Sequence, residues 1–165
     1  MTSDVIAWMR GLAEGAVVET LERTHPMPAI TLKSTPLLRV ALLGDAVASG
    51  ATGLLLAAAA GPLATLLGMP GPLLRGAGLV LLPYVAFVAW AGTRAAPPRW
   101  AVRAAIALNL LWTADSALLL ALGLVSPTTL GVAFVLAQAL VVLGFAVAQW
   151  TALRRAGAGA PVAFA

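Results

Sequence analysis

The sequence predicts an all-α polytopic membrane protein, in which an N-terminal amphipathic surface helix precedes a bundle of four transmembrane helices. Of the 165 residues, 61% are hydrophobic and 10% are charged, whereas soluble domains carry about 25% charged residues. The mean hydropathy is +0.99. Four separate apolar stretches each match the roughly 20 residues needed to cross the hydrocarbon layer of a bilayer. We therefore expect the lipid bilayer to be a partner of this chain.

Residues 1–24 are predicted to form the amphipathic helix, with Ser3 or Asp4 as its N-cap and apolar side chains at helical spacing. The segment lacks the features of a signal peptide, so we expect it to remain in the mature protein. It is expected to lie over the cytoplasmic end of the bundle, with docking on a partner protein or disorder as the alternatives. Residues 25–36, HPMPAITLKSTP, contain three prolines and are predicted to be an extended linker.

The membrane domain is predicted to cover residues 37–155. Glycine and proline interrupt the apolar segment 61–72, which predicts a short helical turn and a hairpin at the membrane surface, with a re-entrant loop as the alternative. Pro83 lies inside a span, where it predicts a kink or a freed carbonyl rather than the end of the helix. Residues 156–165 are small and are predicted to be disordered. The four predicted spans are 37–60, 73–93, 102–122 and 130–150.

Basic residues gather at one end of the predicted spans, and Arg75 alone lies at the other end. The positive-inside rule then predicts that the N-terminus and the C-terminus are both cytoplasmic. The net charge of +4 is therefore interpreted as a topology signal, and no nucleic-acid partner is expected. Trp90, Trp100 and Trp150 fall at the same boundary, as expected for an interfacial aromatic belt. The basic residues at that end are Lys33, Arg39, Arg94, Arg99, Arg103, Arg154 and Arg155.

The two halves of the predicted bundle have similar patterns. Placing Asp45 over Asp115 also aligns Lys33 with Arg103, and a second register aligns the tryptophans that end the second and fourth spans. Such a pattern predicts an internal repeat of two parallel helix hairpins, related by an axis along the membrane normal.

Asp45 and Asp115 are the main candidates for a functional site. An ionised carboxylate inside a membrane costs roughly 2.5–3.5 kcal/mol, so we expect both acids to face the bundle interior, where they are paired, hydrogen-bonded or neutral. Gln149 lies on nearly the same helix face as Gln138, and both could meet the acids. The other polar residues included in this intramembrane site are Ser49, Thr52, Asn109 and Ser116.

Two functions fit these acids. The favoured one is a structural or accessory bundle whose acids hold helices together and which binds a membrane-protein partner. The alternative is a proton-linked transporter of a small solute, for which a homodimer is considered. Catalysis is not expected, because the chain has no cysteine and its one histidine, His25, lies in the linker. No cofactor and no metal site are predicted.

Three runs resemble those of small uncharacterised four-span inner-membrane proteins of bacteria. They are LLRGAGLVLLPYVAFVAW at 73–90, ALNLLWTADSALLLALG at 107–123 and LGVAFVLAQAL at 130–140. The resemblance covers about residues 37–155 and implies four spans in a bacterial inner membrane, with no particular activity.

Overall fold

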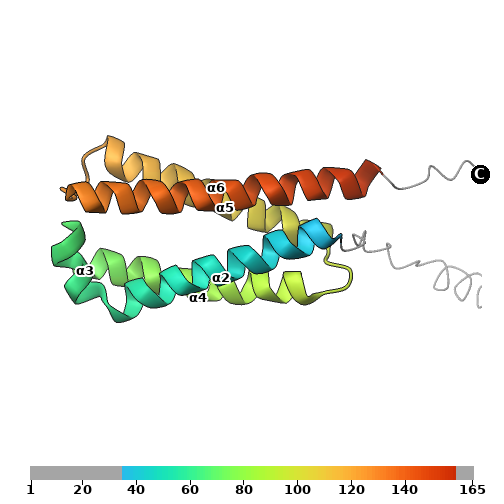
Figure 1. The fold of residues 1–165 in the computed structure, drawn as a ribbon, viewed down its shortest axis with the longest axis horizontal. Coiled ribbons are helices and arrows are strands. Elements are labelled where there is room, and N and C mark those ends of the chain that lie inside the picture. The colour runs from blue at the N-terminus through green and yellow to red at the C-terminus, as the bar shows by residue number, and fades with distance from the viewer. Residues whose placement is uncertain (1–34, 159–165) are drawn as a thin grey trace, which may run out of the picture. The chain divides into compact units, whose positions relative to one another are not determined.

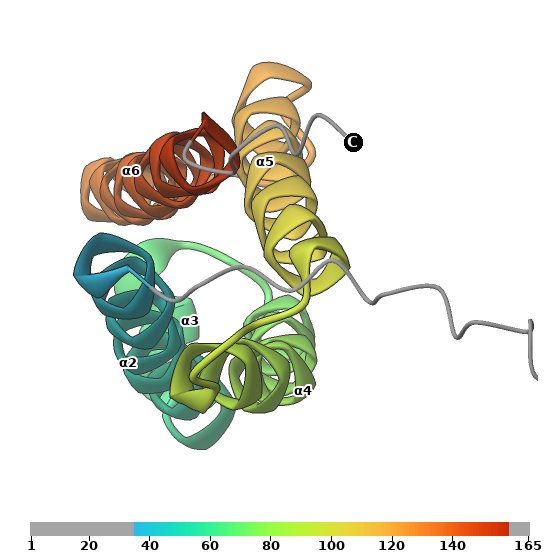
Figure 2. The same ribbon diagram turned by 90° about the vertical axis from the view of Figure 1, so that its right-hand side faces the viewer.

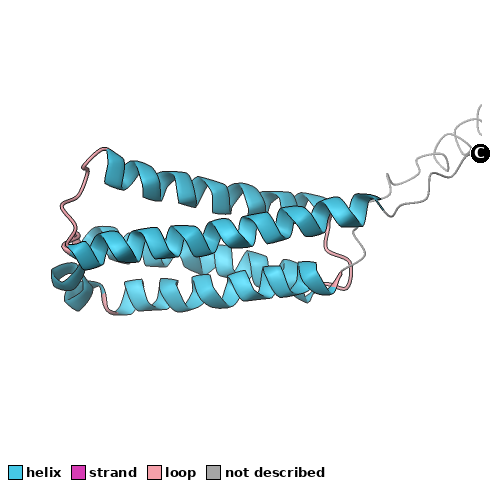
Figure 3. Ribbon diagram, turned by 45° about the horizontal axis from the view of Figure 1, so that its top comes forward, coloured by secondary structure: helices cyan, strands magenta, loops and turns pink. Residues whose placement is uncertain are grey.

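The structure is a computed structural model that describes residues 35–158. The predicted surface helix at 1–24, nearly all of the linker and residues 159–165 lie outside the described residues. Within the described range the fold is all-helical and contains no strand (Figures 1 and 3). Its helices are α2 (Pro36–Ala58), α3 (Ala60–Leu67), α4 (Gly71–Thr93), α5 (Arg99–Ala121) and α6 (Thr129–Ala158).

Four of these helices, α2, α4, α5 and α6, are long and apolar enough to cross a membrane. The predicted fold class, an all-α membrane protein with four spans, is therefore confirmed. The helix bounds differ slightly from the expected spans. The fourth helix continues past Trp150 because the following segment, TALRRA, consists mainly of strong helix formers. Pro83 lies inside α4 without ending it, as predicted.

The spans form two antiparallel hairpins. Helix α4 packs chiefly on α2, and α6 packs chiefly on α5, while α2 and α6 join the two hairpins (Figures 1 and 2). Helices α4 and α5 make far fewer contacts with each other. Seen from the end in Figure 2, α5 begins beside the end of α4 and then diverges from it. The internal repeat of the two hairpins stays a prediction.

Glycines allow α2 and α4 to approach closely. A Cβ atom added to Gly78 would lie 2.6 Å from the backbone nitrogen of Ala57 and the carbonyl oxygen of Gly53. Small residues at such a crossing let two transmembrane backbones pack directly on each other. Gly44 faces the other hairpin, where an added Cβ would lie 3.1 Å from the ring of Phe145.

The short helix α3 closes one end of the bundle. It ends at Gly68, whose φ of +67° is the left-handed conformation that glycine adopts at helix C-termini. The last two carbonyls of α3 accept hydrogen bonds from a distant segment: the backbone N–H of Thr128 donates to the carbonyl of Leu67, and its side-chain hydroxyl donates to that of Leu66. This short helix agrees with the predicted helical turn in the 61–72 segment.

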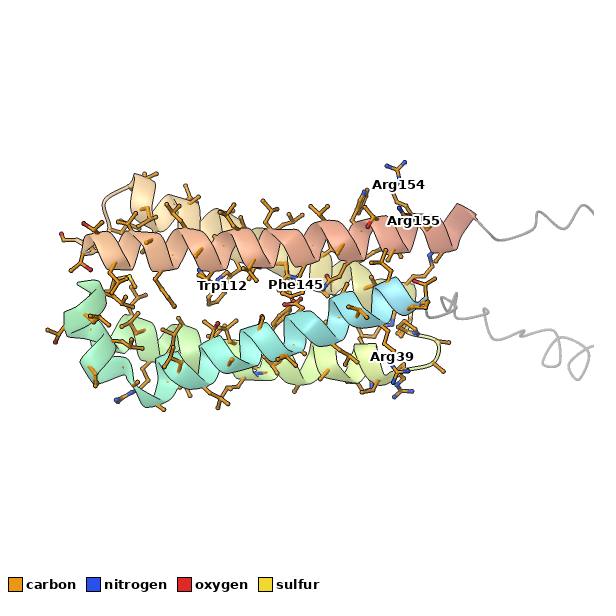
Figure 4. All side chains as sticks on the ribbon, viewed as in Figure 1. Arg39, Trp112, Phe145, Arg154 and Arg155 are labelled. Carbon is orange, nitrogen blue, oxygen red and sulfur yellow. The ribbon has the colours of Figure 1, made fainter. Side chains whose placement is uncertain are left out.

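The opposite end of the described bundle carries most of its arginines, and we call it the arginine end. Helices α2 and α5 begin there, and α4 and α6 end there. Figure 4 shows Arg39, Arg154 and Arg155 at this end. Trp90 stacks with Phe87 at the same end, and the Arg94 guanidinium lies 4.8 Å from the centre of the Trp90 ring.

Apolar side chains form one cluster toward the arginine end and another beside α3. The first includes Leu38, Leu42 and Val102, and the second includes Leu56 and Met69. Five buried residues of the described chain are polar: Asp45, Ser49, Asn109, Ser116 and Gln149. The positions of these polar residues define the candidate site.

Candidate functional site

The described spans meet at the carboxylate of Asp45, whose exposed fraction is 0%. One turn further along α2, the Ser49 hydroxyl donates to Oδ1 at 3.0 Å. Oδ2 accepts from the Tyr84 hydroxyl of α4 at 2.7 Å and from Nδ2 of Asn109 of α5 at 2.7 Å. Nε2 of Gln149 of α6 also donates to Oδ2, at 2.9 Å. We call these five residues the Asp45 cluster.

Helical periodicity explains how this cluster forms. Asn109 lies three and four residues after Ile106 and Ala105, both buried, so it shares their face of α5. Gln149 lies three residues after buried Ala146 on α6 in the same way. The small alanines beside these amides leave room for their side chains to reach across the bundle to α2.

The described donors to Asp45 are all neutral. Hydrogen bonds to a charged group contribute roughly 1.5–3 kcal/mol each, so four of them can offset the roughly 2.5–3.5 kcal/mol cost of an ionised acid in the membrane. The carboxylate is therefore stabilised by hydrogen bonds from groups that carry no formal charge. One acceptor beside it is left over, because Oε1 of Gln149 is buried and has no hydrogen-bond partner in the described structure.

Tyr84 has two alternative acceptors. Its hydroxyl oxygen lies 2.7 Å from Oδ2 of Asp45 and 2.8 Å from Oδ1 of Asn109, but a hydroxyl has a single hydrogen to donate. With Asp45 ionised, that hydrogen points to the carboxylate. With Asp45 protonated on Oδ2, the acid can donate to Tyr84 while Tyr84 donates to Asn109. The same heavy-atom positions thus accommodate both protonation states.

A second polar group links α5 to α6. Nε1 of Trp112 donates to Oε1 of Gln138 at 2.7 Å, and Nε2 of Gln138 donates to the Ser116 hydroxyl at 3.0 Å. Ser116 in turn donates to the backbone carbonyl of Trp112. The structure therefore does not bring Ser116 and Gln138 to Asp45. Thr52 is half-buried beside a small cavity of about 110 Å³ that Trp112 and Gln138 also line.

The expectation that Asp115 faces the bundle interior is wrong, because its side chain is exposed. Ser116, which lies seven residues and almost two turns after Asn109, shares the buried face of α5 instead. Because Asp115 immediately precedes Ser116, it lies on a different face of α5. That face borders the gap where α5 diverges from α4. Asp115 is thus left uncovered in the outer part of the gap between these helices.

Two cavities occupy this gap, and we call them together the α4/α5 cleft. The larger has a volume of about 430 Å³, and the smaller, toward α3, about 210 Å³. Trp112 and Asp115 line both cavities, and Figure 4 shows Trp112 between the two hairpins. The larger cavity is also lined by Tyr84 and Asn109, so one side of the cleft consists of groups that hydrogen-bond Asp45.

Sequence reasoning thus placed Asp45, Ser49 and Asn109 among the site residues, and the structure brings these three together. It also expected Gln149 to reach the acids, which it does at Asp45. Tyr84 was missed. A usable signal was present, since Tyr84 is the chain's one tyrosine and lies in mid-span rather than at the interface. A buried tyrosine hydroxyl usually has a hydrogen-bond partner.

The fold defines a multi-pass helical membrane protein with a polar centre and a lateral cleft. Comparison of the chain with family models, curated proteins and solved structures found no match.

Proposed function

We propose that this protein is a proton-linked transporter of a small solute, with the α4/α5 cleft as the solute site and Asp45 as the proton site. One observation carries this proposal. Tyr84 and Asn109 line the larger cavity and also hydrogen-bond Asp45 directly. A solute in the cleft therefore contacts the groups whose hydrogen bonds depend on whether Asp45 is protonated.

The cleft favours transport over the accessory bundle that the sequence alone favoured. Acids that only hold helices together need hydrogen-bond partners, but they need no cavity of about 430 Å³ beside them. Ligand sites in membrane and soluble bundles are cavities of this kind between helices, lined by apolar side chains and a few polar groups. No catalytic step is included in this function.

Coupling between solute and proton is proposed to run through Tyr84. When Asp45 is ionised, the Tyr84 hydroxyl is held by the carboxylate, and Oδ1 of Asn109 is free to interact with a hydrogen-bond donor or a cationic group of a solute. Protonation redirects the hydroxyl to Asn109, which occupies that acceptor. Each ligand then alters the affinity for the other, and thermodynamic linkage makes the effect reciprocal.

The hydrogen bonds around Asp45 leave room for one more donor. Tyr84 is its only titratable hydrogen-bond partner in the described structure, and Ser49, Asn109 and Gln149 are neutral. The unpaired Oε1 of Gln149 leaves the cluster with surplus acceptors. A proton on Asp45 adds a donor to such a cluster.

We also propose that the arginine end faces the cytoplasm of a bacterial cell and that the membrane is the inner membrane. Six described arginines lie toward that end of the spans, and Arg75 lies near the other. Arginine and lysine concentrate in cytoplasmic loops of multi-pass proteins. The resemblance to bacterial four-span proteins supports the choice of membrane.

The test uses liposomes that contain the purified full chain and an internal pH-sensitive dye. Three solutes that share a naphthalene ring are added separately: a trimethylammonium cation, a neutral alcohol and a sulfonate anion. We expect at least one to move protons faster than in protein-free liposomes. Asp45→Asn, which cannot carry the proton, should reduce this movement to the protein-free rate.

Arg75→Gln is the matched control, since it removes one charge from α4 at an exposed position outside both cavities. It should transport like the wild type. The proposed function is refuted if none of the three solutes moves protons in the wild type, or if Asp45→Asn retains the coupled movement.

A further inference from the structure

We infer that the α4/α5 cleft binds a lipophilic monocation, whose charge pairs with the Asp115 carboxylate and whose apolar body fills the larger cavity, an assignment that rests on the transport function proposed above. Four observations support it: the position of Asp115, the lining of the cavities, their opening, and the connection to Asp45.

The carboxylate of Asp115 lies within a membrane-spanning helix. It is six residues before the end of α5 at Ala121, or roughly 9 Å along the helix axis. The hydrogen bonds of the described residues leave it without a side-chain partner, although its neighbour Ser116 has one. An exposed acid at this depth is costly unless a cation or a proton neutralises it. A cationic solute in either cavity would supply that neutralisation.

The cavity lining suits a cation with an apolar body. Phe87, Tyr84 and Trp112 contribute aromatic rings to the larger cavity, and the Trp112 ring is held in place by its N–H bond to Gln138. Aromatic faces attract cations, most strongly for tryptophan and in a site shielded from water. Neither cavity is lined by an arginine or a lysine of the described chain. An anion would therefore meet the Asp115 carboxylate without a compensating positive charge.

The opening of the cleft is apolar. Val80 on α4 and Leu108 and Leu111 on α5 line the larger cavity and have exposed fractions of 64%, 44% and 56%. In a transmembrane bundle such exposed side chains contact lipid tails. A solute that reaches the cavity between them must first dissolve in the bilayer, so its body is lipophilic.

The cation site and the proton site are connected through Tyr84 and Asn109. A cation in the larger cavity and a proton on Asp45 repel each other across these two side chains, at a depth where little water screens the repulsion. Binding of the cation therefore favours release of the proton. The bundle exchanges one positive charge for another, which is the charge balance of an exchange carrier.

Binding is measured with the same naphthalene-based solutes and full-length protein in lipid nanodiscs, from the fluorescence of the naphthalene ring, with empty nanodiscs as the baseline. The wild type should bind the trimethylammonium cation at least about tenfold more tightly than the alcohol, a ratio that corresponds to about 1.4 kcal/mol. The sulfonate should not bind above the baseline. Asp115→Asn should remove the preference for the cation and leave the affinity for the alcohol unchanged.

Two further variants make the result specific. Asp115→Glu keeps the charge and should retain the preference for the cation, which a purely structural role of Asp115 would not require. Arg75→Gln removes a charge outside the cleft and should bind like the wild type. If Asp115→Asn fails to fold, the comparison of cation with sulfonate in the wild type and in Asp115→Glu decides the question.

The outcomes separate this inference from the proposed function. The cation site would be overturned if the wild type bound the cation and the alcohol equally well. It would also be overturned if Asp115→Asn bound the cation as tightly as the wild type. If the alcohol nevertheless moves protons in an Asp45-dependent manner, proton-linked transport stands without the cation site. If the cation binds through Asp115 but none of the three solutes moves protons, the transport function is overturned and the binding site stands.

Discussion

We expect the stability of the fold to depend strongly on the hydrogen bonds that Asp45 accepts and much less on its negative charge. Comparison of Asp45→Leu with Asp45→Asn separates these roles, because the leucine removes the acceptor whereas the asparagine retains a side-chain oxygen. Like aspartate, both side chains have four heavy atoms and branch at Cγ.

In Asp45→Leu, two donors can find new partners. The Tyr84 hydroxyl can turn to Oδ1 of Asn109, 2.8 Å away, and the Ser49 hydroxyl can turn to the carbonyl four residues earlier. Nδ2 of Asn109 and Nε2 of Gln149 lose their acceptor and stay buried. An orphaned buried donor costs roughly 1–3 kcal/mol, so the pair should cost about 2–6 kcal/mol.

In Asp45→Asn, the side-chain oxygen takes the place of Oδ2 and keeps three donors, while the new amide group faces the Ser49 oxygen. Replacing charged by neutral acceptors weakens each bond by roughly 1 kcal/mol. The variant also avoids the cost of burying a charge in the membrane, roughly 2.5–3.5 kcal/mol, and this gain offsets the weaker hydrogen bonds. Its unfolding free energy should therefore lie within about 1 kcal/mol of the wild type.

The assay is unfolding by titration with sodium dodecyl sulfate in mixed micelles, followed by circular dichroism. Val47→Leu is the control, since Val47 lies on the same helix with an exposed fraction of 73%, and it should change the free energy by less than about 0.5 kcal/mol. If Asp45→Asn is as unstable as Asp45→Leu, or if Asp45→Leu is as stable as the wild type, Asp45 is not the acceptor that holds the four spans together.

Three other results are expected. Tyr84→Phe should lower the unfolding free energy by about 1–3 kcal/mol, because it removes a hydrogen bond to Asp45, and an unchanged value in the same titration would contradict that bond. Gly78→Ala should cost about 1–3 kcal/mol through its backbone clash with α2, whereas Gly76→Ala, with open space around it, should not destabilise the fold; equal effects would argue against the close crossing. Because the chain has no cysteine, a single introduced cysteine reports on which side of the membrane a loop lies. A membrane-impermeant thiol reagent should label Ala96→Cys from the cytoplasmic side and Leu124→Cys from the opposite side. Labelling of both variants from one side would exclude the proposed orientation.

The number and approximate positions of the spans could be predicted from the sequence, because the cost of unpaired backbone groups in lipid requires each long apolar stretch to be a helix. The same physics indicated that Asp45 would be buried with polar partners, and helical spacing indicated Ser49 as one of them. Pro83 was also interpreted correctly, since a membrane tolerates proline within a helix.

Contacts between helices were decided by the tertiary structure. Tyr84 and Gln149 lie 39 and 104 residues from Asp45 in the chain, and which faces meet depends on how each helix is rotated and how closely the α2 and α4 backbones approach at Gly78. The exposure of Asp115 has the same origin. A sequence pattern makes an acid inside a span costly, but only the divergence of α5 from α4 leaves this one beside an open cleft while Asp45 is enclosed by all four spans.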